Sequence, residues 1–287
     1  MSKDEKILNL ILLNVGRAVH HADWNYKNVQ SPFARIYMVK EGKASLCMPD
    51  GVYELKKGYL YLVPSFTLHS YICNDYFVLN YIHVYEDQSA GFSIMELLNL
   101  PVVTDSGLLE TMLIERLLAI NPGRELAKYD PSLYDNESGL IQNVARNAQQ
   151  PLYLKTETAG ILLQLFSLFI AKSSSKIIIT DDRIKKSISY IRKNIKSPIS
   201  TQQLSKICYL SEDHFIRLFK EEIKCTPLQY IIHKKIEHAQ LLLTISNSSI
   251  KDICYSLSFG NVSYFNRVFK SLTGLTPAQY RNKIRLE

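Results

Sequence analysis

The sequence lacks the cysteine pattern of a disulfide-rich or zinc-binding protein. Its 287 residues include five cysteines, an odd number, and no two of them form a C-x-x-C pair. Scattered cysteines of this kind are typical of reduced thiols in an intracellular protein. We therefore expect a cytoplasmic location without disulfides. The five are Cys47, Cys73, Cys208, Cys225 and Cys254.

The sequence also lacks a segment typical of a membrane span or a secretion signal. The most apolar run, residues 159–171, contains Gln164 and Ser167, and it is shorter than the roughly 20 apolar residues that a bilayer requires. The first residues, MSKDEK, lack the basic region of a signal peptide, and no small-residue cleavage pattern follows ILNLILLNV. We expect no membrane partner.

Positive charge is unevenly distributed along the chain. Residues 176–287 contain 19 Lys and Arg against 9 Asp and Glu, a net charge of +10. Residues 1–175 contain 15 against 18, a net charge of −3, and the two parts together give the total of +7. A basic region suits a polyanionic partner such as nucleic acid, although a well-solvated surface would give the same totals.

The basic region carries one sequence unit twice. HFIRLFKEEIKCTPLQY (residues 214–230) and YFNRVFKSLTGLTPAQY (residues 264–280) align at an offset of 50 residues. The apolar spacing predicts a helix, a tight turn and a second helix in each copy, with Ser200 and Ser211 as N-caps in the first. The residues expected to point inward on the second helices are Phe215, Leu218, Phe219, Phe265, Val268 and Phe269.

The outer face of each second helix carries the predicted contacts to DNA. A helix-turn-helix places this helix in the major groove, where the arginine fork bonds O6 and N7 of guanine. Two helical hairpins that only pack, with their arginines as surface charges, are the alternative. We predict base contacts from Ile216, Arg217, Asn261, Ser263, Asn266 and Arg267. We predict phosphate contacts from His214, Lys220, Tyr264 and Lys270.

The last hundred residues resemble the DNA-binding domain of the AraC/XylS family of bacterial transcription regulators. The resemblance is carried by DICYSLSFGNVSYFNRVFKSLTGLTPAQYR. It implies two helix-turn-helix units, at about residues 200–220 and 250–270, joined by a long helix over IIHKKIEHAQLLL. It also implies that one chain binds double-stranded DNA in two major-groove segments about 34 Å apart.

The sequence departs from the family pattern at four positions that usually carry small residues. Ser205 and Cys254 replace alanine, and Tyr209 and Ser258 replace glycine. A tyrosine is poorly suited to the positive φ that glycine allows, so we expect the first turn to be altered or strained.

Two acidic residues, Glu212 and Asp213, begin the first recognition helix. They would repel phosphates. The two interpretations are that they cap the helix, which we favour, or that they accept a hydrogen bond from cytosine N4.

Residues from about 14 to 85 alternate between apolar and polar, with turns between, which predicts a β-sandwich or small barrel. RIYMVKEGKASL, LKKGYLYLVPSFTLHSY and YIHV resemble the cupin-type barrel found in many family members. The resemblance implies an α+β chain of two domains, a cupin-like β-barrel with helices followed by an all-α double helix-turn-helix. We predict a sensor and dimerisation domain over 1–172, a linker over 173–181 and a DNA-binding domain over 182–287.

The predicted barrel presents aromatic faces with polar tips, which suit a carbohydrate or another small polar ligand. Ordinary half-buried barrel residues are the alternative for each. Arg35 could pair with a carboxylate ligand, although we favour a surface salt bridge. The predicted ligand-binding residues are Arg35, His69, Tyr71, Tyr81 and His83.

The sequence lacks the His-x-His pair of a metal-dependent cupin enzyme. His69 and His83 lie on different predicted strands, and adjacent His20 and His21 would point to opposite faces of a strand. We therefore predict no metal, no cofactor and no enzymatic activity. The alternatives are a cupin-type enzyme tethered to DNA and a regulator that binds no ligand.

Two further helices, at residues 105–120 and from about 156 to 171, have apolar surface enough for a partner chain. We therefore predict a homodimer that regulates transcription in response to a small effector, with RNA polymerase as a further partner. Activation is the more usual role in the family. The inward face of the first of these helices is expected to carry Leu108, Leu109, Met112, Leu113, Leu117 and Ile120.

Overall fold

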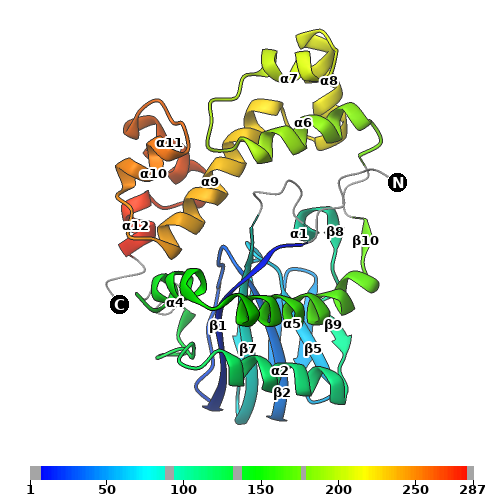
Figure 1. The fold of residues 1–287 in the computed structure, drawn as a ribbon, viewed down its shortest axis with the longest axis vertical. Coiled ribbons are helices and arrows are strands. Elements are labelled where there is room, and N and C mark those ends of the chain that lie inside the picture. Colours follow the sequence, from blue (N-terminus) through cyan, green and yellow to red (C-terminus); the bar gives the residue numbers. More distant parts are fainter. Residues whose placement is uncertain (1–7, 88–93, 132–137, 176–178, 283–287) are drawn as a thin grey trace. The chain divides into compact units, whose positions relative to one another are not determined.

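The computed structural model (Figure 1) describes residues 8–87, 94–131, 138–175 and 179–282. The chain divides into two compact units. Of the described residues, the first unit contains 8–86, 100–131 and 138–174, and it holds the predicted strands. The second contains residues 87, 94–99, 175 and 179–282, and it is mostly helical.

The first unit contains two antiparallel sheets. Strand order is β1-β7-β2-β5-β9 in the larger sheet and β4-β3-β6 in the smaller one. Over the described residues the sheets stay separate, so the cupin-like barrel that we predicted is not closed. The strands are β1 (Leu10–His21), β2 (Ala34–Gly42), β3 (Ala44–Met48), β4 (Gly51–Leu55), β5 (Tyr59–Val63), β6 (Ser70–Ile72), β7 (Tyr76–Glu86) and β9 (Val103–Asp105).

Gly42 marks the corner where the chain leaves the larger sheet for the smaller one. Its φ is +68°, and a Cβ added there would lie 2.1 Å from the carbonyl oxygen of Tyr76. Only glycine tolerates both the left-handed backbone and this close approach. The two sheets are therefore joined by a sharp corner between β2 and β3.

An aromatic core fills the space between the two sheets. Alternate residues of β2 and β7, such as Tyr37, Phe77 and Tyr81, point into it, as the period of a strand requires. Trp24, the single tryptophan, lies in the same core and is 4% exposed.

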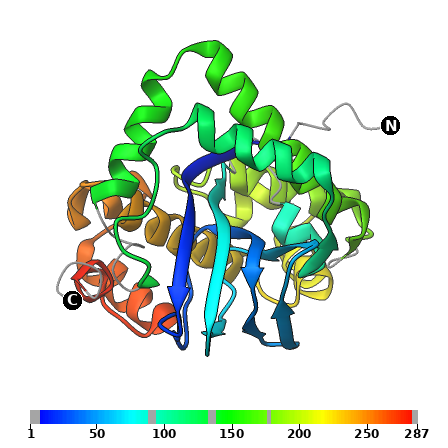
Figure 2. The same ribbon diagram turned by 90° about the horizontal axis from the view of Figure 1, so that it is seen from below.

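Helices α2 (Leu108–Ile120) and α5 (Leu152–Ala171) pack against each other and contact β1, and Figure 2 shows them crossing over the larger sheet. A third helix, α4 (Ser138–Gln149), also contacts β1. By length and composition α5 could cross a membrane. Six of its 20 residues are buried in the unit.

The structure corrects the predicted helices of the first unit. In α2 the buried residues are Ile114, Leu117 and Ile120, whereas Leu108, Leu109 and Met112 are 60–75% exposed. Leu117 and Ile120 are thus buried as predicted, and the prediction is wrong for the first turns, because the apolar stripe is wider than the face that the rest of the unit covers. Helix α5 begins at Leu152, after Pro151, rather than near Thr156.

The second unit consists of two helix-turn-helix units connected by one helix. Helix α9 (Pro227–Ile245) joins them, and Figure 1 shows it running from one group of helices to the other. The other helices are α6 (Asp182–Lys193), α7 (Thr201–Ile207), α8 (Glu212–Ile223), α10 (Ile250–Ser256), α11 (Val262–Thr273) and α12 (Pro277–Asn282). Short elements α1 (Ile94–Leu97), β8 (Leu98–Asn99) and β10 (Ser174–Ser175) complete the described chain.

The repeated residues form the same local structure in both copies. Thr226 and Gln229 form a capping box at the start of α9, and Thr276 and Gln279 make the same hydrogen bonds before α12. Ser200 caps α7 as predicted, through its side chain. Ser205 and Cys254 are both buried.

Both turns keep the left-handed conformation that glycine usually provides. Tyr209 and Ser258 each have φ of +55°, so the first turn is not altered and the tyrosine carries the strain. The two recognition helices also both end in a left-handed residue, and only the second of these is a glycine. Lys224 ends α8 at φ +67°, whereas Gly274 ends α11 at φ +79°.

We predict that Tyr209→Gly stabilises the protein. The tyrosine side chain is 87% exposed, so little packing is lost, and relief of the left-handed strain should raise the free energy of unfolding by roughly 0.5–1 kcal/mol. Urea unfolding followed by circular dichroism measures this. Ser258→Gly is the control, because Ser258 Oγ donates a hydrogen bond to the Lys196 carbonyl and its loss should cancel the gain. Equal or lower stability of Tyr209→Gly would contradict the prediction.

Candidate DNA-binding surface and ligand cavity

Helix α8 presents a basic face to solvent. Phe215 and Phe219 are fully buried, and this anchoring leaves His214, Arg217 and Lys220 exposed. The predicted phosphate contacts, His214 and Lys220, thus lie on the same helix face as Arg217. The remaining predicted base contact, Ile216, is half-buried.

Helix α11 repeats this arrangement. Phe265 and Phe269 are fully buried, and the predicted contacts Ser263, Tyr264, Arg267 and Lys270 are exposed. The Arg267 guanidinium carbon lies 5.5 Å from the centre of the Tyr264 ring. That stacking holds the arginine side chain near the start of the helix.

Two of the predicted base contacts, Asn261 and Asn266, differ from the exposed residues of α11 in their hydrogen bonding or burial. Asn261 is the N-cap, and its Oδ1 accepts a hydrogen bond from the Tyr264 backbone N–H at 2.7 Å. Its amide N–H groups are not used by the cap and remain to contact a base. Asn266 is half-buried, and its Oδ1 has no hydrogen-bond partner in the described part of the chain.

The acidic residues at the start of α8 do not cap it through hydrogen bonds. Ser211 is the N-cap, but no side-chain cap is formed, and Glu212 and Asp213 are exposed. The capping interpretation therefore reduces to attraction by the helix dipole. The corresponding residues of α11 are Val262 and Ser263, so the first recognition helix begins with more negative charge than the second.

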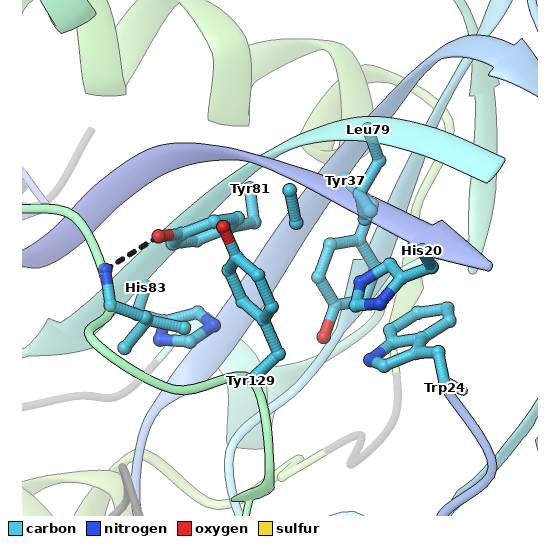
Figure 3. Close-up of a pocket in the computed structure, with 9 residues that line it drawn as sticks. His20, Trp24, Tyr37, Leu79, Tyr81, His83 and Tyr129 are labelled. Carbon is cyan, nitrogen blue, oxygen red and sulfur yellow. Dashed lines mark hydrogen bonds between the residues drawn. The ribbon is translucent and has the colours of Figure 1, made fainter.

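The first unit contains one small cavity in the aromatic core (Figure 3), among those that the described residues form. Its volume of about 20 Å³ is space for about one water molecule. It is far smaller than a typical ligand pocket of several hundred Å³. The lining residues are Ala18, His20, Trp24, Tyr37, Leu79, Tyr81, His83, Leu126 and Tyr129.

Stacked rings form one wall of this cavity. The Trp24 ring stacks on Tyr71, with centroids 4.0 Å apart, and on His20 at 5.3 Å. The Tyr129 ring meets His20 edge-on at 5.1 Å. Across the cavity, the Tyr81 hydroxyl accepts a hydrogen bond from the Leu126 backbone N–H at 2.6 Å. Burial raises the pKa of Tyr81, so the cavity lining is neutral there.

A chain of hydrogen bonds runs behind the stacked rings. His69 Nδ1 lies 2.8 Å from the Thr67 carbonyl oxygen, which can only accept, so Nδ1 carries the proton. His69 Nε2 then accepts from the Tyr71 hydroxyl at 2.6 Å. Tyr37 donates in turn to Tyr71, with the oxygens 2.6 Å apart. The sequence of donors fixes the orientation of all three side chains.

Arg35 lies in the protein interior, which corrects the surface salt bridge that we favoured. It is 1% exposed, its Nη2 donates to Ser31 Oγ at 2.6 Å, and its guanidinium stacks on Phe33. Because its strand neighbours Tyr37 and Val39 face the core, position 35 faces the same way.

His69 and His83 are brought together near Arg35, although the sequence placed them on separate strands. Burial, and then the charge of Arg35, lower the pKa of His69 to about 3 and hold the pKa of His83 well below its usual value. Both rings are neutral at pH 7, and the nearby guanidinium disfavours a bound cation. No group of three or more His, Cys, Asp or Glu side chains among the described residues could hold a metal ion.

Sequence reasoning found part of the cavity. Tyr81 and His83 line it, whereas Tyr71 contacts it through Trp24, and His69 and Arg35 lie behind. The residues that it missed include His20, Trp24, Tyr37 and Tyr129. The alternation of β1 identifies His20, which is 2% exposed, as facing inward, opposite to exposed His21. No periodic signal marks Tyr129.

Comparisons with known proteins match the second unit. The family model described as a helix-turn-helix domain matches residues 204–283. The chain is 32% identical over 97 residues to the MmsAB operon regulatory protein of Pseudomonas aeruginosa, covering 34% of this chain and 32% of that protein. It is 29% identical over 97 residues to the probable transcriptional regulator LumQ of Photobacterium leiognathi, covering 34% and 39%. The match thus spans 32% of the first relative and 39% of the second.

Solved structures give two similarities of different extent. A transcriptional regulator with an AraC-type DNA-binding domain from Chromobacterium violaceum is 24% identical over 36% of this chain and 91% of its own, with a TM-score of 0.34. ToxT from Vibrio cholerae, with an unsaturated fatty acid bound, is 16% identical over 99% of this chain and 98% of its own, with a TM-score of 0.47.

The second unit is a double helix-turn-helix domain. Its residues 204–283 match the helix-turn-helix family model, and its sequence signature resembles the DNA-binding domain of the AraC/XylS family.

We predict that the first unit loses stability as pH falls below neutral. The pKa of His69 is about 3 in the folded chain, against about 6.5 unfolded. Between those values only the unfolded state gains the proton, so stability falls with pH. From pH 7 to 5.5 this ring should cost roughly 1 kcal/mol. Urea unfolding followed by Trp24 fluorescence reports on this unit.

His69→Gln removes the titrating ring and should reduce that loss, while exposed His21→Gln should leave it unchanged. An identical pH dependence in wild type and His69→Gln would contradict the assignment.

Proposed function

We propose that the protein is a sequence-specific DNA-binding transcription regulator. The observation that carries the proposal is the equivalence of Arg217 and Arg267. Each is exposed on the second helix of a helix-turn-helix unit, two residues from phenylalanines that are fully buried on the opposite face. No carboxylate in the described part of the chain pairs with either guanidinium. Both are therefore available to bond guanine.

The two helix-turn-helix units are proposed to occupy successive major-groove segments on one face of the DNA. Their base contacts are Arg217 and Ile216 on α8, and Ser263, Asn266 and Arg267 on α11, with Asn261 at its cap. Phosphate contacts come from His214, Lys220, Tyr264 and Lys270. The net charge of +10 over residues 176–287 supports binding to a polyanion.

The starts of the recognition helices favour unequal contributions from the two units. Glu212 and Asp213 lie where a helix approaches the DNA backbone, so α8 is repelled by phosphates unless its carboxylates accept from cytosine N4. Helix α11 has no acidic residue. We therefore infer that α11 supplies more of the affinity for DNA.

The aromatic cavity is the proposed effector site of the first unit. Its volume of about 20 Å³ would not hold a sugar ring, so a carbohydrate or other polar effector could enter only if aromatic side chains move. Tyr129 and Leu126 lie on the segment that follows α2, outside the two sheets. Displacement of that segment would enlarge the cavity without breaking strand pairing. The second candidate is a regulator that binds no ligand, because the aromatic rings leave so little space in the cavity.

The double helix-turn-helix does not define the cellular location, the direction of regulation or the protein partner. We propose a cytoplasmic regulator, with activation as its mode and RNA polymerase as its contact. The named relatives are regulatory proteins, which agrees with the prediction that the chain is not an enzyme.

A homodimer is proposed from the exposed apolar residues of α2. Leu108, Leu109 and Met112 are 75%, 60% and 61% exposed, and they lie within the first two turns of one helix. Grouped apolar side chains of this size are unusual on a monomer surface. A symmetric pair of chains would cover them and present four recognition helices.

We predict that wild-type protein recovers discrete fragments from sheared genomic DNA and that the double variant Arg217→Ala/Arg267→Ala does not. Loss of a bidentate guanine contact costs roughly 1–3 kcal/mol at one base position. Each single variant should therefore bind the recovered site about 10- to 100-fold more weakly and relax specificity at one base. Sequencing of bound fragments, with dissociation constants at fixed salt, measures both effects.

Lys220→Ala is the matched control on the same helix face. It should weaken binding to all sequences alike and reduce the salt dependence, because a phosphate contact releases counterions. Recovery of the same fragments by wild type and by the double arginine variant would refute the proposal.

We predict that Leu109→Glu/Met112→Glu converts a dimer into a monomer. The chain has a mass of 33.0 kDa, and sedimentation velocity at micromolar concentration separates one chain from two. Introduced carboxylates on both partners would be desolvated and repel each other across the interface. Ala119→Glu, exposed on the same helix but outside this group, should leave the dimer intact. Sedimentation of wild type as one chain would remove the dimer proposal.

A further inference from the structure

Helix α9 belongs to two separate hydrophobic cores. Tyr230 and Ile231, near its start, pack in the core of the first helix-turn-helix unit with α6, α7 and α8. Ile236, Ala239 and Leu243 pack in the core of the second helix-turn-helix unit with α10 and α11. Between these two sets the helix carries a charged residue, Lys235.

Lys235 is buried at the point where α9 passes from one core to the other. It is 6% exposed. Its Nζ donates to the Leu257 carbonyl oxygen at 2.6 Å and to the Ser197 carbonyl oxygen at 3.2 Å. Leu257 ends α10 in the second helix-turn-helix unit, whereas Ser197 lies in the loop before α7 in the first helix-turn-helix unit. One ammonium group therefore bonds backbone from both helix-turn-helix units.

A second hydrogen bond connects the same two segments. Ser258 Oγ donates to the Lys196 carbonyl oxygen at 2.5 Å. Ser258 is the left-handed residue of the second turn, so its backbone position is set by that turn. Adjacent residues of one loop, Lys196 and Ser197, are thus held by adjacent residues of the other, Leu257 and Ser258, with Lys235 between them.

A buried ammonium is costly unless it is hydrogen-bonded. Here the partners are carbonyl groups, and burial lowers the pKa of Lys235. An apolar residue would extend either core at lower cost. The lysine instead fixes the distance between two loops that have no shared hydrophobic core. That geometry controls the placement of α8 relative to α11, because each recognition helix follows its own turn.

We propose that Lys235 is a positioning residue that sets the spacing and rotation between the two recognition helices, and hence the separation of the two DNA segments that one chain recognises. This inference rests on the proposed function. One base pair inserted between the segments moves the second by about 3.4 Å and rotates it by roughly 35°. A rigid pair of units cannot follow that change, whereas a loosened pair can.

The test uses the full-length chain and the DNA site recovered by the wild type. Dissociation constants are measured for duplexes in which the separation of the two segments is changed by zero, one or two base pairs, and for a duplex with one segment. Wild type should lose about 30-fold or more on a one-base-pair insertion, of the order expected for losing one segment's contacts. Lys235→Met, which has a similar length without the charge, should differ by less than about 3-fold across the separations.

Lys251→Met is the matched control. Lys251 is an exposed lysine of α10 in the same unit, so its loss removes one positive charge without touching the two loops. It should lower affinity slightly for every duplex and keep the wild-type dependence on spacing. Lys235→Met should bind the single-segment duplex within about 3-fold of that control, because each recognition helix is itself unchanged.

Ser258→Ala guards against loss of folding in Lys235→Met, since it removes only the second hydrogen bond between the loops. It should relax the spacing dependence in the same direction by a smaller factor. A spacing profile identical to wild type in every folded variant of Lys235 and Ser258 would overturn this inference alone. Failure of the wild type to select any site would overturn the proposed function, and this inference with it.

Discussion

The continuity of α9 is the constraint on which the second unit depends. A helix of 19 residues extends roughly 28 Å, and it contributes side chains to both cores while belonging wholly to neither. Each helix-turn-helix unit is too small to bury a core of its own without this shared helix. The arrangement of the two recognition helices therefore follows from one helix and from the hydrogen bonds of Lys235 beside it.

Burial and exposure are coupled on the recognition helices. Phe215 and Phe219 on α8, like Phe265 and Phe269 on α11, lie one turn apart and enter the core. Their packing determines the rotation of each helix about its axis, so Arg217 and Arg267 are exposed at equivalent places. The same packing that stabilises the domain thus orients the side chains proposed to read DNA.

The first unit uses its interior differently. Aromatic rings and a buried Arg35 occupy the space between two sheets, and the remaining cavity is small. The hydrogen-bond chain from Thr67 through His69 to Tyr37 holds neighbouring rings in fixed orientations. An effector would have to displace packed side chains, and the cost of that displacement would make binding sensitive to ligand size and shape.

The sequence by itself determined the duplicated helix-turn-helix. Its repeat, its cap at Ser200 and its exposed arginines depend on local spacing, which a helix converts directly into faces. The resemblance to the family implied the glycine-type positions at Tyr209 and Ser258, and both keep a positive φ because a tight turn constrains φ whatever residue occupies it. Within the cavity, Tyr81 and His83 followed from strand alternation.

Only the tertiary structure decided which of several apolar faces is covered. Leu108, Leu109 and Met112 are as apolar as the buried face of α2, so the choice depended on the sheet beneath it. The burial of Arg35, the approach of His69 to His83 and the contribution of Tyr129 to the cavity bring together residues far apart in sequence. Such contacts arise from how the two sheets and the following segment pack, and no local period encodes them.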